Sequence, residues 1–184
     1  MINRSLALAL AVATLLATQA HAAAPTRFVF GDAAAPAGHT RVAPGTLYDT
    51  ARGYGFEPGA EHGAEHGARY FSVDLPEGNY AVTVVLGDDG RATATTIKSE
   101  LRRLMLENVF TASGQNVVRT FVVNVRTPRI AAVPGVAAGA VDLKAPRETE
   151  TEAWNWDGRL TLEFNGSPTA VQRLEIVPAR MPTL

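Results

Sequence analysis

The chain has 184 residues, of which 46% are apolar and 19% charged, and its formal net charge is −1. This length and composition fit one globular domain with a sizeable core, and they exclude a disordered chain. The near-neutral charge gives no basic field that would indicate nucleic-acid binding. The chain has no cysteine, which excludes disulfides, thiolate metal sites and a cysteine nucleophile.

Residues 1–22 have the pattern of a secretory signal peptide. Arg4 precedes an apolar run from Leu6 to Ala17, and the Ala-His-Ala sequence at 20–22 is a small-x-small cleavage motif. The run is short for a membrane-spanning helix, although an N-terminal membrane anchor is the alternative interpretation. We therefore expect export to the periplasm or the medium, a mature chain from near Ala23, and no stable membrane insertion after cleavage.

Residues 27–178 are predicted to form one β domain. Short segments alternate apolar and polar residues and are separated by Gly, Pro, Asn and Asp, which is typical of strands. The predicted strands cover 27–31, 68–75, 79–87, 93–99, 102–109, 116–126, 159–164 and 171–178. Their number and spacing predict an all-β fold, an antiparallel β-sandwich or jelly roll.

Other segments are less regular. Residues 99–108 also fit an amphipathic helix through Leu101, Leu104 and Met105, but Leu104 and Leu106 fit a strand, which we favour because the neighbouring segments are strands. Loops are predicted at 31–46, at 57–68 and at 129–148. Residues 179–184 are expected to begin a linker, because two prolines lie near the end of the chain.

The sequence carries no hydrolase signature. Its serines lie outside any G-x-S-x-G motif, and there is no Gly-Asp-Ser block. A Ser-His-Asp triad assembled from distant residues stays open, but nothing marks one.

Two weak metal signals are present. His62 and His66 have the spacing of zinc ligands on a helix, but the surrounding glycines and proline favour a solvated loop with a repeated EHGA sequence. Asp88 and Asp89 are weak candidates for a structural calcium site, and a simple hairpin turn is favoured over it. No other cofactor is expected.

Both tryptophans, Trp154 and Trp156, precede an Asp157-Gly158 turn signal. A two-residue hairpin there would pair Trp156 with Arg159 and place both rings on the polar face of the following strand. A three-residue loop would turn both rings into the core. The two alternatives stay open at this point.

Most of the mature chain, from Phe28 to Val177, resembles the N-terminal domain of bacterial rhamnogalacturonan acetylesterases of the GDSL/SGNH hydrolase group. The segments that carry the resemblance are FVFGDAAAPAGHTRVAPGTLYDTARGYGFEPG, YFSVDLPEGNYAVTVVLG, ELRRLMLENVFTASGQNVVRTFVVNVRTPRI and APRETETEAWNWDGRLTLEFNG, with GYGF and ELRRLMLENV the most specific. The resemblance implies a galactose-binding-like β-sandwich. In that family a hydrolase domain follows and opens with the Gly-Asp-Ser nucleophile block, which this sequence does not contain, so no catalytic residue can be carried over.

Two hypotheses on function follow, and whether the chain is itself an enzyme stays open. The chain is expected to be a non-catalytic accessory module, and its partner is either plant cell-wall polysaccharide or a C-terminal hydrolase domain. In the first case Trp154, Trp156 and Tyr54 would stack on sugar rings, and Arg52 or Asp157 would bond sugar hydroxyls. In the second, the aromatic patch would pack on the hydrolase domain. A stand-alone secreted carbohydrate-binding protein is the alternative, and an esterase in its own right is less favoured.

Overall fold

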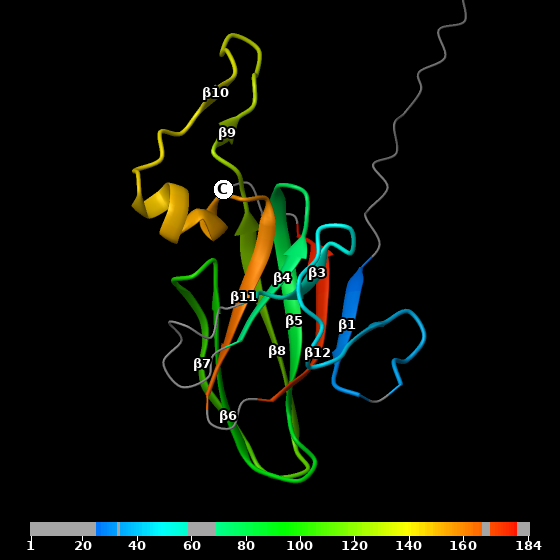
Figure 1. Ribbon diagram of the computed structural model, residues 1–184. Coiled ribbons are helices and arrows are strands. Elements are labelled where there is room, and N and C mark those ends of the chain that lie inside the picture. The colour runs from blue at the N-terminus through cyan, green and yellow to red at the C-terminus, as the bar shows by residue number, and fades with distance from the viewer. Residues whose placement is uncertain (1–24, 33, 59–68, 167–169, 180–184) are drawn as a thin grey trace, which may run out of the picture.

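The computed structural model describes residues 25–32, 34–58, 69–166 and 170–179. Two five-stranded sheets pack face to face around one core, so the predicted all-β sandwich is confirmed (Figure 1). The predicted signal peptide, the pair His62 and His66, and residues 180–184 lie outside the described residues. In the part of the chain that the structure describes, no helix has the length and apolar character needed to cross a membrane.

The first sheet has the order β2-β1-β12-β5-β8. All its ladders are antiparallel except the one between β1 and β2. The five strands are β1 (Thr26–Phe30), β2 (Thr40–Val42), β5 (Gly78–Gly87), β8 (Asn116–Val125) and β12 (Val171–Pro178).

The second sheet has the order β3-β4-β11-β6-β7 and is antiparallel throughout. Its strands are β3 (Tyr54–Phe56), β4 (Arg69–Asp74), β6 (Thr93–Ser99), β7 (Arg103–Thr111) and β11 (Arg159–Asn165). The strand interpretation of residues 99–108 is therefore confirmed for the part from Arg103 onward, and the helical alternative is wrong. Residues 100–102 form the turn that joins β6 to β7.

The core lies between the sheets and follows the predicted period of two. The alternating apolar residues of β5, β8, β11 and β12 all point inward and are buried. They are Tyr80, Val82, Val84, Leu86, Phe121, Val123, Val125, Leu160, Leu162, Phe164, Leu174 and Ile176. Aromatic residues from β1, β3 and β4 close one side of this core, where Phe28 packs edge-on against Phe71 with ring centroids 5.2 Å apart.

Strand register gives the sandwich two distinct ends. In the ladder of β5 and β8, Gly78 lies opposite Val125 at one end, and Gly87 lies opposite Asn116 at the other. β11 begins at the first of these ends and finishes at the second (Figure 1). We call the first the tryptophan end, since Trp154 and Trp156 precede β11, and the second the distal end.

A short arm extends from the tryptophan end. It consists of β9 (Arg129–Ile130) and β10 (Gly139–Ala140), which form a separate two-stranded sheet beyond the body of the sandwich (Figure 1). Two helical turns then return the chain to β11, η2 (Arg147–Thr151) and η3 (Ala153–Asn155). The segment predicted as a loop at 129–148 thus contains a hairpin and the start of a helical turn.

Replacing Leu162 with alanine should test the core. Leu162 is fully buried in the central strand of its sheet. Removing its side chain should lower the free energy of unfolding by about 2–5 kcal/mol, because the cavity left behind collapses only in part. Urea unfolding would measure this loss, and Val118→Ala, at an exposed apolar position, should change the value by no more than about 0.5 kcal/mol. Equal losses in the two variants would contradict the described packing.

Candidate functional site

Neither of the two hairpin alternatives at Asp157-Gly158 forms, because the residues before the turn do not pair with β11. β11 pairs with β4 along one edge and with β6 along the other, so neither edge is left for the residues before the turn. Those residues form η2 and η3 instead of a strand. The turn itself exists: Oδ1 of Asp157 accepts the backbone N–H of Arg159 at 3.0 Å, and Gly158 has a φ of +73°.

Trp154 lies on the outer face of the β3–β7 sheet. Its ring meets Tyr70 at an angle of 62°, with centroids 5.3 Å apart. Tyr70 lies opposite Glu163 in the ladder of β4 and β11, on the side facing away from the core residues Phe71 and Leu162. Trp154 is half-buried, so it neither joins the core nor stands free in solvent.

Trp156 is also half-buried but has a different partner. The guanidinium carbon of Arg126 lies 4.3 Å from the centroid of its ring, which is a cation–π contact. Arg126 directly follows β8 of the other sheet. Trp156 therefore spans the end of the sandwich, while Trp154 covers one outer face.

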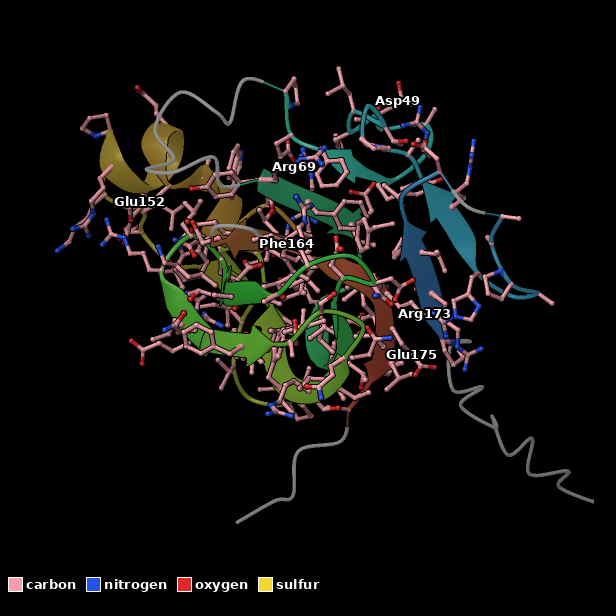
Figure 2. All side chains as sticks on the ribbon, turned by 90° about the horizontal axis from the view of Figure 1, so that it is seen from below. Asp49, Arg69, Glu152, Phe164, Arg173 and Glu175 are labelled. Atoms are coloured by element: carbon pink, nitrogen blue, oxygen red, sulfur yellow. The ribbon has the colours of Figure 1, made fainter. Side chains whose placement is uncertain are left out.

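Tyr54 and Arg52 lie apart from the tryptophans. Tyr54 is opposite Val73 in the ladder of β3 and β4 and packs toward the core on Phe28, with centroids 5.0 Å apart. Arg52 lies over the Tyr54 ring at 5.7 Å. Trp154 is on the opposite face of this sheet, and Figure 2 shows Glu152, beside the tryptophans, well separated from Asp49, beside Arg52. These residues do not form one stacking platform.

Asp157 belongs to a charge cluster around Arg159. The guanidinium nitrogens of Arg159 lie within 3.4–3.7 Å of carboxylate oxygens of Glu57, Asp74 and Asp157. The same guanidinium lies 4.4 Å from the centroid of the Tyr48 ring. This cluster links Asp157, a predicted site residue, to β4, to β11 and to the residue that follows β3. No sequence pattern predicted the cluster.

Asp157 and Tyr48, both in the charge cluster at the tryptophan end, have a raised pKa. Burial raises the pKa of Asp157 above its ordinary value of 3.8. Burial, together with a hydrogen bond from its hydroxyl to Asp74, raises the pKa of Tyr48 to about 12. The low-dielectric surroundings therefore disfavour the charged forms of both side chains.

Glu100 is the most deeply buried acid here, at 1% exposure. β6 ends at Ser99, so the backbone carbonyl and N–H of Thr161 in β11 need partners from the turn that follows β6. Glu100 supplies both: its backbone N–H donates to the carbonyl of Thr161 at 2.9 Å, and its Oε1 accepts the Thr161 N–H at 3.0 Å. Burial raises its pKa to about 7, and the negative charge of Asp157 acts in the same direction.

The turn that carries Glu100 is strained. Glu100 and the next residue, Leu101, have φ values of 50° and 63°, which side-chain-bearing residues rarely adopt. The turn is held to the helical segment by an ion pair between Arg102 and Glu152. Neither Glu100 nor Tyr70 stood out in the sequence, because the contacts that define them come from distant segments.

Two polar atoms at this end are buried without a hydrogen bond among the described residues, Nε of Arg126 and Oδ2 of Asp157. Buried polar groups are almost always hydrogen-bonded, so such atoms mark a place where a further polar partner is expected. The tryptophan end thus combines half-buried aromatic rings, buried charges and incompletely bonded polar atoms.

The calcium expectation stays a prediction. Asp88 accepts the backbone N–H of Gly90 at 2.9 Å through Oδ1 and pairs with Arg91 at 3.2 Å through Oδ2. The hydrogen bond from Gly90 lowers the pKa of Asp88. Within the described ranges, no group of three or more His, Asp or Glu side chains could hold a metal ion.

Comparison with known proteins supports the fold. No protein-family model matches the chain, and a search of curated proteins found no match. Among solved structures the chain is similar to protein YxiM from Bacillus subtilis, with a TM-score of 0.50 and 22% sequence identity over 85% of this chain. The chain spans only 40% of the length of YxiM. At this identity the similarity shows a shared β-sandwich fold alone.

The raised pKa of Glu100 predicts a pH-dependent stability. Between its ordinary value of 4.5 and about 7, the folded protein binds more protons at Glu100 than the unfolded chain does. The free energy of unfolding should therefore fall as pH rises through this window, by about 2–3 kcal/mol. Asp157, whose pKa is also raised, adds to the fall at lower pH.

Urea unfolding at several pH values would measure this dependence. Glu100→Gln keeps a carbonyl acceptor for the Thr161 N–H but carries no charge, so it should remove most of the fall. Glu107→Gln, at an exposed position of β7, is the matched control and should keep it. A fall of equal size in Glu100→Gln and the unsubstituted protein would contradict the assignment to Glu100.

Proposed function

We propose that this chain is a non-catalytic accessory β-sandwich module of an exported carbohydrate acetylesterase acting on rhamnogalacturonan or related pectin. In this proposal its tryptophan end docks on the hydrolase domain of that enzyme. The sequence resemblance supplies the family, and the similarity to YxiM supports the sandwich fold that the resemblance implies. The observation that carries the docking role is the exposed apolar arm beside the tryptophans.

The arm presents large aliphatic side chains to solvent. Ile130, Val133, Val136 and Val141 are each 43–57% exposed. An isolated two-stranded hairpin is marginally stable in water, and clusters of exposed apolar residues are typical of protein interaction sites. Val133 and Val136 pair with each other through backbone hydrogen bonds at the tip, so both lie on the same small surface.

The arm suits a protein partner better than a sugar. Between Ile130 and Val141 the chain is built from Ala, Val, Pro and Gly and has no polar side chain. A sugar needs hydrogen-bonding groups for its hydroxyls, whereas the core of a protein interface is largely apolar.

A second candidate function, carbohydrate binding, is favoured by a different observation. A cavity at the distal end is lined by three phenylalanines together with charged and amide side chains. Such a mixture of aromatic surface and a few polar groups is typical of small-ligand sites. Under this candidate function the chain binds polysaccharide by itself.

Tryptophan fluorescence can test the docking role, because both tryptophans of the chain lie at the tryptophan end. Adding a GDSL-type hydrolase domain from the same organism should shift the emission and protect it from iodide quenching. The double variant Val133→Asp/Val136→Asp should weaken the complex at least about tenfold, since a charge would be buried at the contact. Val118→Asp, at an exposed apolar position of β8, should leave the affinity unchanged.

Two results would count against docking through this end. One is an unchanged emission spectrum at saturating hydrolase domain, and the other is an equal loss of affinity in Val118→Asp and the double variant. Protection of the same fluorescence by pectin fragments, with no response to the hydrolase domain, would assign the tryptophans to carbohydrate binding instead.

A further inference from the structure

The distal end of the sandwich contains a cavity of about 570 Å³. The residues around it lie where β1, β5 and β11 finish and where β4 and β12 begin. The cavity is thus at the opposite end from Trp156, which contacts the residue following β8. Its volume falls within the range of typical small-ligand sites.

Aromatic rings form the apolar part of the cavity wall. Phe30 packs edge-on against Phe164, with centroids 5.7 Å apart, and lies 6.0 Å from Phe56. Phe56 and Phe164 are anchored in the core, while Phe30 is half-buried. Sugar rings present a face of C–H groups that packs well on such aromatic surface.

Two arginines, Arg69 and Arg91, and two aspartates, Asp88 and Asp89, place charge of both signs on the same wall. Arg69 lies over the Phe56 ring at 3.7 Å and donates to the carbonyl of Pro44. The side chain of Arg91 is 62% exposed and pairs with Asp88 through Nε, which leaves its two terminal nitrogens without a hydrogen bond among the described residues. Figure 2, which views the molecule from this end, shows Arg69 and Phe164 near each other.

Gln172 supplies an oriented amide. Its Nε2 donates to the carbonyl of Gly87 at 3.0 Å and to Oδ1 of Asn116 at 2.8 Å. Both amide hydrogens are therefore engaged, and the side-chain carbonyl remains as an acceptor. A hydroxyl group is the natural donor to such an oxygen.

We propose that this cavity binds an acidic sugar, a hexuronate unit of an oligosaccharide. The terminal nitrogens of Arg91 bind the carboxylate, because a guanidinium group matches a carboxylate in charge and shape. Asp88 and Gln172 accept hydroxyls, and the half-buried ring of Phe30 packs on the apolar face of the sugar. The inference rests on the carbohydrate-binding candidate function and is independent of docking at the tryptophan end.

Titration with digalacturonate and with neutral galactobiose, followed by backbone amide NMR, tests the proposal. Digalacturonate should shift the amide signals of Gly31, Gly87 and Gly90, and galactobiose should bind at least about tenfold more weakly, since it lacks the charge-assisted contact. Arg91→Ala should weaken digalacturonate binding by about tenfold. The matched control Arg119→Ala removes an exposed arginine that does not line the cavity and should change the affinity less than about twofold.

The outcomes separate the proposal from its rivals. Equal affinity for the acidic and neutral disaccharides, equal losses in Arg91→Ala and Arg119→Ala, or no binding of digalacturonate would each overturn it. Shifts confined to Trp154 and Trp156 would place the sugar at the other end and also overturn it. The double variant Val133→Asp/Val136→Asp should bind digalacturonate as the unsubstituted protein does, so loss of docking and loss of sugar binding are distinguishable.

Discussion

The position of β11 is the constraint on which the rest of the structure depends. This strand pairs on both edges and is buried on both faces, since Thr161 and Glu163 on its outer side are as enclosed as Leu160 and Leu162 on its inner side. A strand enclosed in this way must have every backbone group bonded within the protein. β6 is too short to bond all of them, and Glu100 takes over where β6 ends.

The solution at Glu100 places a titratable group inside the protein. A carboxylate makes a stronger acceptor for the Thr161 N–H than a neutral group would, but burying its charge is unfavourable. The raised pKa is the balance of these effects, and Asp157 shifts that balance further toward the protonated form. The tryptophan end therefore gathers buried charge for a structural reason, and Trp156 packs on Arg126 at the same end.

Local periodicity was enough to predict most of the fold. Alternation in β5 and β11 identified the inward residues, for example Val82 and Leu162, because side chains of a half-buried strand must alternate between core and solvent. The Asp157-Gly158 turn was also recognised. The pairing across it was not, because a hairpin signal is local whereas the partners of β11 come from β4 and β6, far away in the sequence.

The site residues were harder to predict for the same reason. Trp154 and Trp156 were expected to share a face, but a helical turn between η2 and β11 sends one ring to Tyr70 and the other to Arg126. Arg91 and Gln172 lie about 80 residues apart in the sequence and carry no motif, so nothing in the sequence joins them. Only the register of β5 against β12 brings Gly87 and Gln172 together.

The two ends of the sandwich are free to serve different roles because a rigid core separates them. Substitutions at distant sites without shared partners act almost independently, whereas residues in one network do not. The arm with Val133 and Val136 shares no described contact with the cavity wall around Phe30 and Arg69. A β-sandwich can thus present an apolar surface to a neighbouring domain at one end and a charged, aromatic cavity to a sugar at the other. Residues at either end can be substituted while the packing of the two sheets is kept.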